Sequence, residues 1–381
     1  MKKFKVLQLH PDYNVKTHDF ADLAEQIIMA LPEQEYEVTS AYLRGKPEVG
    51  EPVSKAAHSH YFEFSDDDLG GLRLRALWRL YRFCRGQGFD VVICNRFKPL
   101  SMMMLLNRWL KVPLCIGIIH RMGEFDRGYR RRQVHKLGQR GWYFVGVSQA
   151  VRQHLLEYQH GFGEHNTLAI TNAIDVDQAV GLQLPSGQAR SQLGLDPAAV
   201  MVGALGRLVQ VKGHCYLIEA FSRLKDKYPQ AQLAIIGEGK QRPALQAQID
   251  GLGLQERVHL LGFRADALQY ARAFDIWVMP SLAEGLGLAL LEGMSGALPV
   301  IASDVPAMRP LIDGAGGIAV PPADVNALTA ALDRYLGATT QERQRLGQQA
   351  FDYVCREHSI EEYRLAYRQL IRQGLGLDRP G

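Results

Sequence analysis

Cysteine is scarce in this chain of 381 residues, and the few cysteines lie far apart in the sequence. The five positions show neither the paired spacing of a zinc site nor the density of a disulfide framework: Cys84, Cys94, Cys115, Cys215 and Cys355. No apolar run approaches the ~20 residues of a membrane span. The basic start, residues 1–10, has no apolar core of signal-peptide length. We therefore expect a protein of the reducing cytoplasm.

Net charge is also small, and its excess lies in the first half of the chain. The formal total is +4: residues 1–180 carry 24 Lys/Arg against 20 Asp/Glu, and residues 181–381 carry 20 of each. In residues 72–85, arginines are interleaved with large apolar residues, a composition that suits anionic lipid headgroups. A helix with one solvated and one buried face would show the same pattern. We expect peripheral contact with the anionic inner face of the cell membrane and, because no binding motif is present, no nucleic-acid partner.

Length and periodicity predict two α/β domains, since single cores stop growing near ~250–300 residues. Short apolar runs alternate with helical patterns, which is typical of doubly wound parallel sheets. The first helix is expected to begin at Asp19 as its N-cap. In the first half we expect strands at residues 6–9, 36–42, 91–95, 114–119 and 143–147.

Turn residues place the domain boundaries. We expect an N-terminal Rossmann-like domain over residues 1–180, a linker at 181–197 and a C-terminal Rossmann-like domain over 198–358. A final helix over residues 359–375 is expected to cross back to the first domain. Ligands of such sheets bind at the carboxyl ends of the strands, so the residues that follow each strand are the informative ones.

The stretch 276–302 reads as strand, glycine-rich turn, helix and strand. Glu284 and Glu292 stand eight residues apart in the turn and helix, which at helical rise is roughly 12 Å. This separation is too large for an acid/base pair on one bond, but it suits two groups of one extended ligand. Free N–H groups at the helix start offer a seat for phosphate between them. An ordinary α/β helix with two exposed glutamates is the alternative.

Together with Pro299-Val300-Ile301-Ala302, this pattern closely resembles the donor site of glycosyltransferase family 4, the retaining GT-B enzymes. Further similar segments follow the family order: Val147-Ser148, Thr171–Asp175, Gly206-Arg207-Leu208 with Lys212-Gly213, and Gly237-Glu238-Gly239. The resemblance implies two doubly wound, Rossmann-like domains facing across a cleft. The first 110 residues resemble the family only in the alternation of strands and helices. The loop 10–18 lacks the Gly-Gly pair that many members have there, so it is expected to face the acceptor or to be a surface loop.

The resemblance also implies roles for individual residues. Glu284 would hold sugar hydroxyls, and Glu292 the ribose. His120 would steady the charge that develops during transfer, although a lone histidine is often structural. The remaining donor contacts would be Arg207 and Lys212 at the leaving phosphates, Arg264 at the base, and the backbone of Gly285, Leu286, Gly287, Leu288 and Ala289 around the sugar and phosphates.

The function implied is transfer of a hexose or N-acetylhexosamine, with retention, from a nucleotide-sugar to a saccharide or lipid-linked saccharide acceptor. Family frequency makes uracil the expected base, and the class suggests lipopolysaccharide-core or surface-polysaccharide assembly. No cofactor or metal is expected, since Arg207 and Lys212 would carry the phosphate charge; Asp175-Val176-Asp177 resembles a metal motif of another fold only superficially. The alternatives are an epimerase or hydrolase, a phosphorylase (whose cofactor lysine motif is not found), and a non-catalytic nucleotide-sugar-binding subunit.

Overall fold

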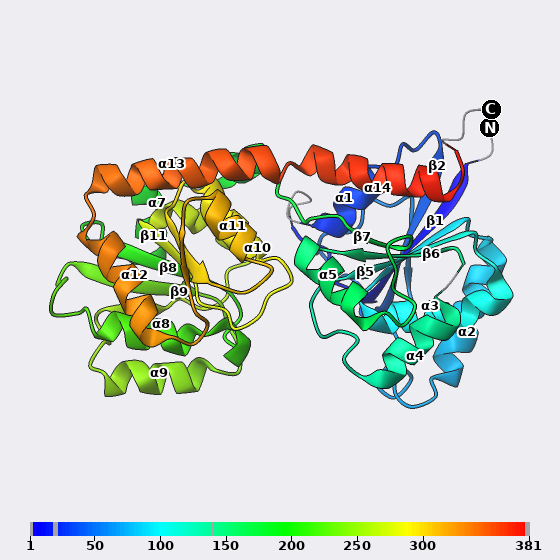
Figure 1. Cartoon of the computed structure of the whole chain (residues 1–381), viewed down its shortest axis with the longest axis horizontal. Helices are drawn as coiled ribbons and strands as arrows, with labels where there is room; N and C mark the ends of the chain where they lie inside the picture. Colours follow the sequence, from blue (N-terminus) through cyan, green and yellow to red (C-terminus); the bar gives the residue numbers. More distant parts are fainter. Residues whose placement is uncertain (1–2, 18–21, 139, 378–381) are drawn as a thin grey trace. The chain divides into compact units, whose positions relative to one another are not determined.

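The computed structural model describes residues 3–17, 22–138 and 140–377. The chain forms two compact units, and each is built on its own parallel sheet (Figure 1). The first unit contains Met1–Asn172 together with Ile360–Gly381, and the second contains Ala173–Ser359. The first unit is therefore made of two segments separated in the sequence by the whole second unit.

The first unit has a seven-stranded sheet with strand order β3-β2-β1-β4-β5-β6-β7. All neighbouring strands pair in parallel. Its strands are β1 Phe4–Asp12, β2 Tyr36–Arg44, β3 His58–Tyr61, β4 Val91–Asn95, β5 Leu114–Ile119, β6 Trp142–Gly146 and β7 Thr167–Ala169. Its helices are α1 Leu23–Met29, α2 Leu74–Gln87, α3 Phe97–Leu110, α4 Gly128–Leu137, α5 Gln149–Tyr158 and α14 Ile360–Gly374.

Helices cover both faces of this sheet. Right-handed crossovers place α1 on one face and α2, α3 and α4 on the other, because the strand order reverses at β1 and β4. α14 packs against α1, and α2, α3 and α4 pack in succession (Figure 1). The hydroxyl of Tyr363 on α14 donates to the carbonyl of Leu23, and Arg364 donates to the side chain of Gln26. The final helix thus completes the first unit.

The second unit has a six-stranded parallel sheet with strand order β10-β9-β8-β11-β12-β13. Its strands are β8 Val200–Leu205, β9 Ala231–Ile236, β10 Val258–Leu260, β11 Ile276–Met279, β12 Val300–Ser303 and β13 Ile318–Val320. Its helices are α6 Val176–Leu182, α7 Ser186–Leu193, α8 His214–Ser222, α9 Arg242–Gly251, α10 Leu288–Ser295, α11 Arg309–Gly314, α12 Val325–Gly337 and α13 Thr340–Glu357, with 3₁₀ turns η2 Gln210–Lys212 and η3 Ala267–Ala273. The core consists mainly of aliphatic side chains between the sheet and its helices.

Two doubly wound, Rossmann-like α/β domains are therefore confirmed. The strands expected at 91–95 and 114–119 have those bounds in the structure. The expected cap Asp19 lies outside the described residues; the N-cap of α1 is Asp22, whose carboxylate accepts from the backbone of Ala24 and Glu25.

The segment 181–197, predicted as a linker, contains α7 and groups with the second unit. The physical reason is Arg190, a buried residue of α7. Its guanidinium donates to Asp275 at 2.7 Å and to the backbone of Ala273 and Ala199, which fixes α7 to the second unit.

Candidate functional site

The predicted donor residues gather where the second sheet changes direction. β8 and β11 are neighbours, but β8 leads to β9 on one side and β11 leads to β12 on the other. Loops that leave neighbouring strands in opposite directions leave a crevice at the carboxyl edge, which is where doubly wound sheets bind ligands. The loop after β8 carries Arg207 and Lys212, and the loop after β11 carries Glu284.

The loops after β8 and β11 are joined by backbone contacts. The N–H of Leu282 donates to the carbonyl of Val211 at 2.7 Å. Gly213 has φ +66°, and a Cβ built on it would lie 2.0 Å from the carbonyl oxygen of Pro280. Only a glycine can occupy this place without moving the backbone, so Gly213 fixes the distance between the two loops.

The loop after β9 is held to the loop after β8 in the same way. The N–H of Leu208 donates to the carbonyl of Glu238 at 2.9 Å. Cβ atoms at Gly237 and Gly239 would lie 1.9 Å and 2.4 Å from the carbonyl oxygens of Gly206 and Leu208. The glycines that carried the family resemblance therefore serve close backbone packing, and they make one connected edge of three loops.

Within this edge, Lys212 and Glu284 form an ion pair. The ammonium donates to Oε1 of the carboxylate at 2.6 Å, and the two side chains are only 18% and 14% exposed. Within the described part of the chain, Oε2 of Glu284 has no hydrogen-bond partner. From the sequence, Lys212 is expected at the phosphates and Glu284 at the sugar. The structure adds that the ammonium of Lys212 orients the carboxylate of Glu284.

Arg207 and Arg264 are both exposed. Among the described residues, no carboxylate lies within ion-pair distance of Arg207, so its positive charge is available to an anionic ligand. Arg264 follows β10 at the edge of the sheet, two strands away from β8, and its guanidinium donates to the carbonyl of Phe263 at 3.2 Å. The structure therefore brings Arg207 to the crevice and leaves Arg264 at its periphery.

The start of α10 forms the other wall of the candidate site. Gly287 is the N-cap with φ +103°, and it follows the buried backbone of Gly285 and Leu286. The N–H groups of Leu288 and Ala289 belong to the first turn of α10, where a helix offers no carbonyl to accept from them. Neither donates to another described residue. Two unpaired donors at the positive end of a helix are suited to an anion.

Glu292 lies on the second turn of α10 and is partly buried. Because α10 begins at Leu288, only four steps of helix separate its first residue from Glu292, and Glu284 lies in the preceding loop. The helical rise of roughly 12 Å inferred from the sequence is therefore wrong as a measure of the separation of the two acids, since half of the segment is not helical.

His214 is a candidate that sequence reasoning missed. It is the first residue of α8, and it is buried beside the backbone of Gly206 and Arg207. Burial lowers its pKa to about 4, and the neighbouring charge of Lys212 acts in the same direction. The imidazole is therefore neutral at pH 7. Its position directly after Lys212-Gly213 was visible in the sequence, but its burial was not.

His120 belongs to the first unit, where it follows β5. The strand order of that sheet reverses between β1 and β4. Nε2 of His120 lies 3.4 Å from Oδ1 of Asn95 at the end of β4. Burial lowers the pKa of His120 to about 4, with Arg96 as a second cause, and burial lowers that of His10 on β1 to about 3. Two neutral imidazoles and an amide thus lie near the place where the strand order of this sheet reverses. Asn95 and His10 were not predicted, because neither belongs to a recognisable sequence motif.

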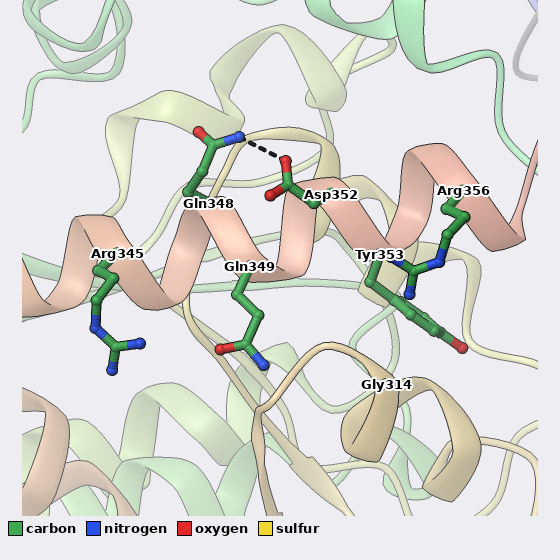
Figure 2. A pocket seen from close by; sticks show the side chains of 7 residues that line it. All are labelled: Gly314, Arg345, Gln348, Gln349, Asp352, Tyr353 and Arg356. Carbon is green, nitrogen blue, oxygen red and sulfur yellow. Dashed lines mark hydrogen bonds between the residues drawn. The ribbon is translucent and has the colours of Figure 1, made fainter.

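A separate hollow of about 470 Å³ lies between α13 and the end of α11 (Figure 2). Gln348 donates to Asp352 along α13 at 2.8 Å, whereas Arg345 and Gln349 extend from the other side of the helix in this view. A Cβ at Gly314 would lie 2.0 Å from the ring of Tyr353, so the two helices meet closely there. None of the predicted site residues lines this hollow.

Other candidate features have structural roles. Asp175, from the sequence that resembled a metal motif, is the N-cap of α6 and accepts from the N–H of Gln178 at 3.1 Å. No cluster of three His, Cys, Asp or Glu suited to a metal occurs among the described residues. Among the described helices, none combines the length and the apolar composition needed to cross a bilayer. Ser148 is the N-cap of α5, and its side chain accepts from the N–H of Val151.

Comparison with known proteins agrees with this geometry. Residues 23–178 match the family model described as Glycosyltransferase Family 4, and residues 198–338 match the model described as Glycosyl transferases group 1. The alpha-D-kanosaminyltransferase of Streptomyces kanamyceticus is 32% identical over 174 residues, 45% of this chain and 45% of that protein. The lipopolysaccharide core biosynthesis glycosyltransferase LpsE of Rhizobium meliloti is 32% identical over 186 residues, 48% of this chain and 52% of that protein. The chain spans about half the length of these curated relatives.

Solved structures match over nearly the whole chain. HepE of Anabaena in complex with UDP superposes with a TM-score of 0.79 at 18% identity, covering 97% of this chain and 100% of that one. Sucrose-phosphate synthase of Thermosynechococcus elongatus gives a TM-score of 0.80 at 18% identity, covering 99% and 100%. With both halves matched in order by family models and the whole matched in fold, the chain belongs to the glycosyltransferases of GT-B fold, with a family 4 domain followed by a group 1 domain.

Proposed function

We propose that this protein is a hexosyltransferase that moves a hexose or N-acetylhexosamine from a UDP-sugar to a saccharide or lipid-linked saccharide, with retention at the anomeric carbon. The observation that carries the proposal is the Lys212–Glu284 pair beside the unpaired N–H groups at the start of α10. A carboxylate with one free oxygen suits sugar hydroxyls, and a helix start suits a diphosphate. The two lie in consecutive parts of one loop and helix.

The donor side of the mechanism follows from these contacts. Oε1 of Glu284 is held by Lys212, and Oε2 accepts from a sugar hydroxyl. The Lys212–Glu284 pair is neutral as a whole, so the charge of the leaving diphosphate is met by Arg207 and by the N–H groups of Leu288 and Ala289. Glu292 accepts from the ribose hydroxyls. This set supplies the electrostatic stabilisation without requiring a divalent metal.

The acceptor side rests on the family resemblance and on His120. The acceptor attacks from the face that the diphosphate leaves, and the leaving phosphate takes the acceptor's proton. Because the pKa of His120 is lowered to about 4, its imidazole is neutral at pH 7 and can contribute a hydrogen bond but no full charge. Arg264 remains the proposed contact for the base.

The choice of substrates is supported by the relatives. HepE has been solved with UDP and with UDP-glucose, which favours uracil as the base for a chain of the same fold. LpsE and the mannosyltransferase LpsB of Rhizobium meliloti are named for lipopolysaccharide core biosynthesis, which favours a saccharide or lipid-linked acceptor. We place the reaction in lipopolysaccharide or polysaccharide assembly at the cytoplasmic face of the cell membrane.

The test of the donor site is Glu292→Ala. Loss of a charged hydrogen bond to the ribose should weaken UDP binding about 10- to 100-fold, measured by isothermal titration calorimetry. Glu219→Ala is the matched control, because Glu219 is a helical glutamate of the same unit whose one ion pair with a described residue is to Arg223. Unchanged UDP affinity in the Glu292 variant would refute the assignment. The anomeric configuration of the product, read by NMR, tests retention separately.

A further inference from the structure

The three helices α2, α3 and α4 form a layer of one charge sign. They carry ten Lys/Arg, four on α2, two on α3 and four on α4, and across their described residues there is no Asp or Glu. They pack in succession on one face of the first sheet. One of the ten, Arg75, pairs with Asp68 just before α2 at 3.4 Å, and the other nine form no ion pair with a described carboxylate. This excess of positive charge on neighbouring helices produces a positive potential that attracts an anionic partner.

Large apolar side chains are exposed on the same layer. Trp78 on α2 is 57% exposed and Trp109 on α3 is 64% exposed. Leu74 on the first turn of α2 is 69% exposed, and Leu72 just before it is 81% exposed. These residues are not a part of the core that happens to reach the surface: α2 buries Ala76, Leu80 and Cys84 on its opposite side.

Arginine and tryptophan are in direct contact on both helices. The guanidinium of Arg82 lies 4.7 Å from the ring of Trp78, and that of Arg108 lies 5.5 Å from the ring of Trp109. Each pair presents an aromatic ring and a cation at one place. Tryptophan favours the headgroup level of a bilayer, where its ring is buried and its N–H stays wet, and arginine binds lipid phosphates there.

From these observations we infer that the α2–α3 surface is a docking face for an anionic phospholipid bilayer. Leu72, Leu74, Trp78 and Trp109 enter the headgroup region, and Arg82 and Arg108 bind the phosphates beside them. A soluble polyanion would use the charge but would leave the exposed leucines in water. The inference goes beyond the proposed function and does not depend on the donor site, which lies in the other unit.

The test uses the full chain and vesicles of two compositions, phosphatidylcholine alone and phosphatidylcholine with 30% phosphatidylglycerol. We expect co-sedimentation with the anionic vesicles at low salt, a blue shift of tryptophan emission, and loss of binding at high salt. The paired variant Trp78→Ala with Trp109→Ala and the paired variant Arg82→Glu with Arg108→Glu should each reduce the partition coefficient about tenfold or more. Arg82→Lys with Arg108→Lys should retain most of the binding.

The controls are Leu365→Ala, an exposed leucine on α14, and Arg334→Glu, an exposed arginine on α12. Both should bind vesicles as the parent chain does, and circular dichroism and UDP binding should show that all variants fold. Failure to bind anionic vesicles at low salt, equal binding to both vesicle types, or unchanged binding by both paired variants would overturn the inference. Binding to heparin or nucleic acid without binding to vesicles would overturn it too.

Discussion

The carboxylate of Glu284 has two oxygens, and within the described residues the protein engages only one of them. Lys212 holds Oε1 at 2.6 Å in a place where little of either side chain meets solvent. A carboxylate fixed in this way is oriented before a ligand arrives, so less side-chain entropy is lost on binding. The pair therefore links the stability of the loop to the binding of the sugar.

Lys212→Met tests this link. Removing one partner leaves a shielded carboxylate without its counter-charge, which should cost about 1–3 kcal/mol in the free energy of unfolding and should lower the rate of sugar transfer by at least about tenfold. Urea unfolding and a donor-turnover assay measure the two effects. Lys227→Met is the control, because Lys227 forms an equally short pair with Asp333 on the exposed surface. If both variants behaved alike, the Lys212–Glu284 pair would have no special role.

At the scale of single residues, the sequence suggests which residues to place in the site but not which contacts they make. Glu284, Glu292, Arg207 and Lys212 are proposed as site residues because each follows a recognisable strand in a known order. The pairing of Lys212 with Glu284 joins residues 72 positions apart, and no local pattern reports such a distance. His214 was missed for the same reason, since its burial is produced by side chains from the rest of the unit.

The elements that position the site are loops whose backbones touch. The loops after β8, β9 and β11 approach so closely that glycine is required at several contacts, among them Gly213 against Pro280. Close backbone approach of this kind leaves little room for motion, so the cations and the carboxylate are held on a stiff edge. The glycines of the family motifs thus act on the site through packing.

Gly213→Ala should therefore damage both folding and function. A positive φ alone costs an alanine about 1–2 kcal/mol, and at Gly213 the added Cβ would also meet the carbonyl of Pro280 at 2.0 Å. Gly194→Ala is the matched control, because Gly194 has nearly the same φ, +67°, with no atom within 4 Å of a built Cβ. We expect Gly213→Ala to lose clearly more stability in urea and, unlike the control, to lose UDP affinity. Equal losses would show that the contact with Pro280 is unimportant.

Elements were predicted well where their signals were long or continuous. β11 was found because four apolar residues precede a glycine-rich turn. β3, β7 and β13 were not predicted, because a strand of only three or four residues is too short to show a period. α7 was read as linker from its turn residues, whereas its place is set by Arg190 and distant backbone carbonyls.

At the scale of the whole molecule, the first unit depends on a helix that the chain supplies after the second unit. α14 buries Tyr363, Tyr367 and Ile371 against the first unit, and Tyr363 and Arg364 bond to α1. The sequence predicted this return from the resemblance to GT-B proteins. Its contacts could not be predicted, because they join residues more than 330 positions apart.

Ile371→Ala tests the contribution of α14. Ile371 is fully buried, so the cavity left behind should destabilise the first unit by about 2–5 kcal/mol. Leu365→Ala on the same helix is the control, because Leu365 is 53% exposed and should change stability by about 0.5 kcal/mol or less. Hydrogen exchange reads each unit separately. If Ile371→Ala made exchange faster in the second unit rather than in the first, α14 would not have this role. Equal losses of stability in Ile371→Ala and Leu365→Ala would contradict it as well.

The position of α14 also sets an order of events on the ribosome. Domains tend to fold as they emerge, at ~5–20 residues per second, so synthesis of residues 173–359 takes on the order of 10–40 s. For all of that time the surface that α14 will cover on α1 has no cover of its own. The first unit, which is translated first, is therefore the last to be completed. While the second unit is synthesised, the uncovered surface of α1 is open to aggregation.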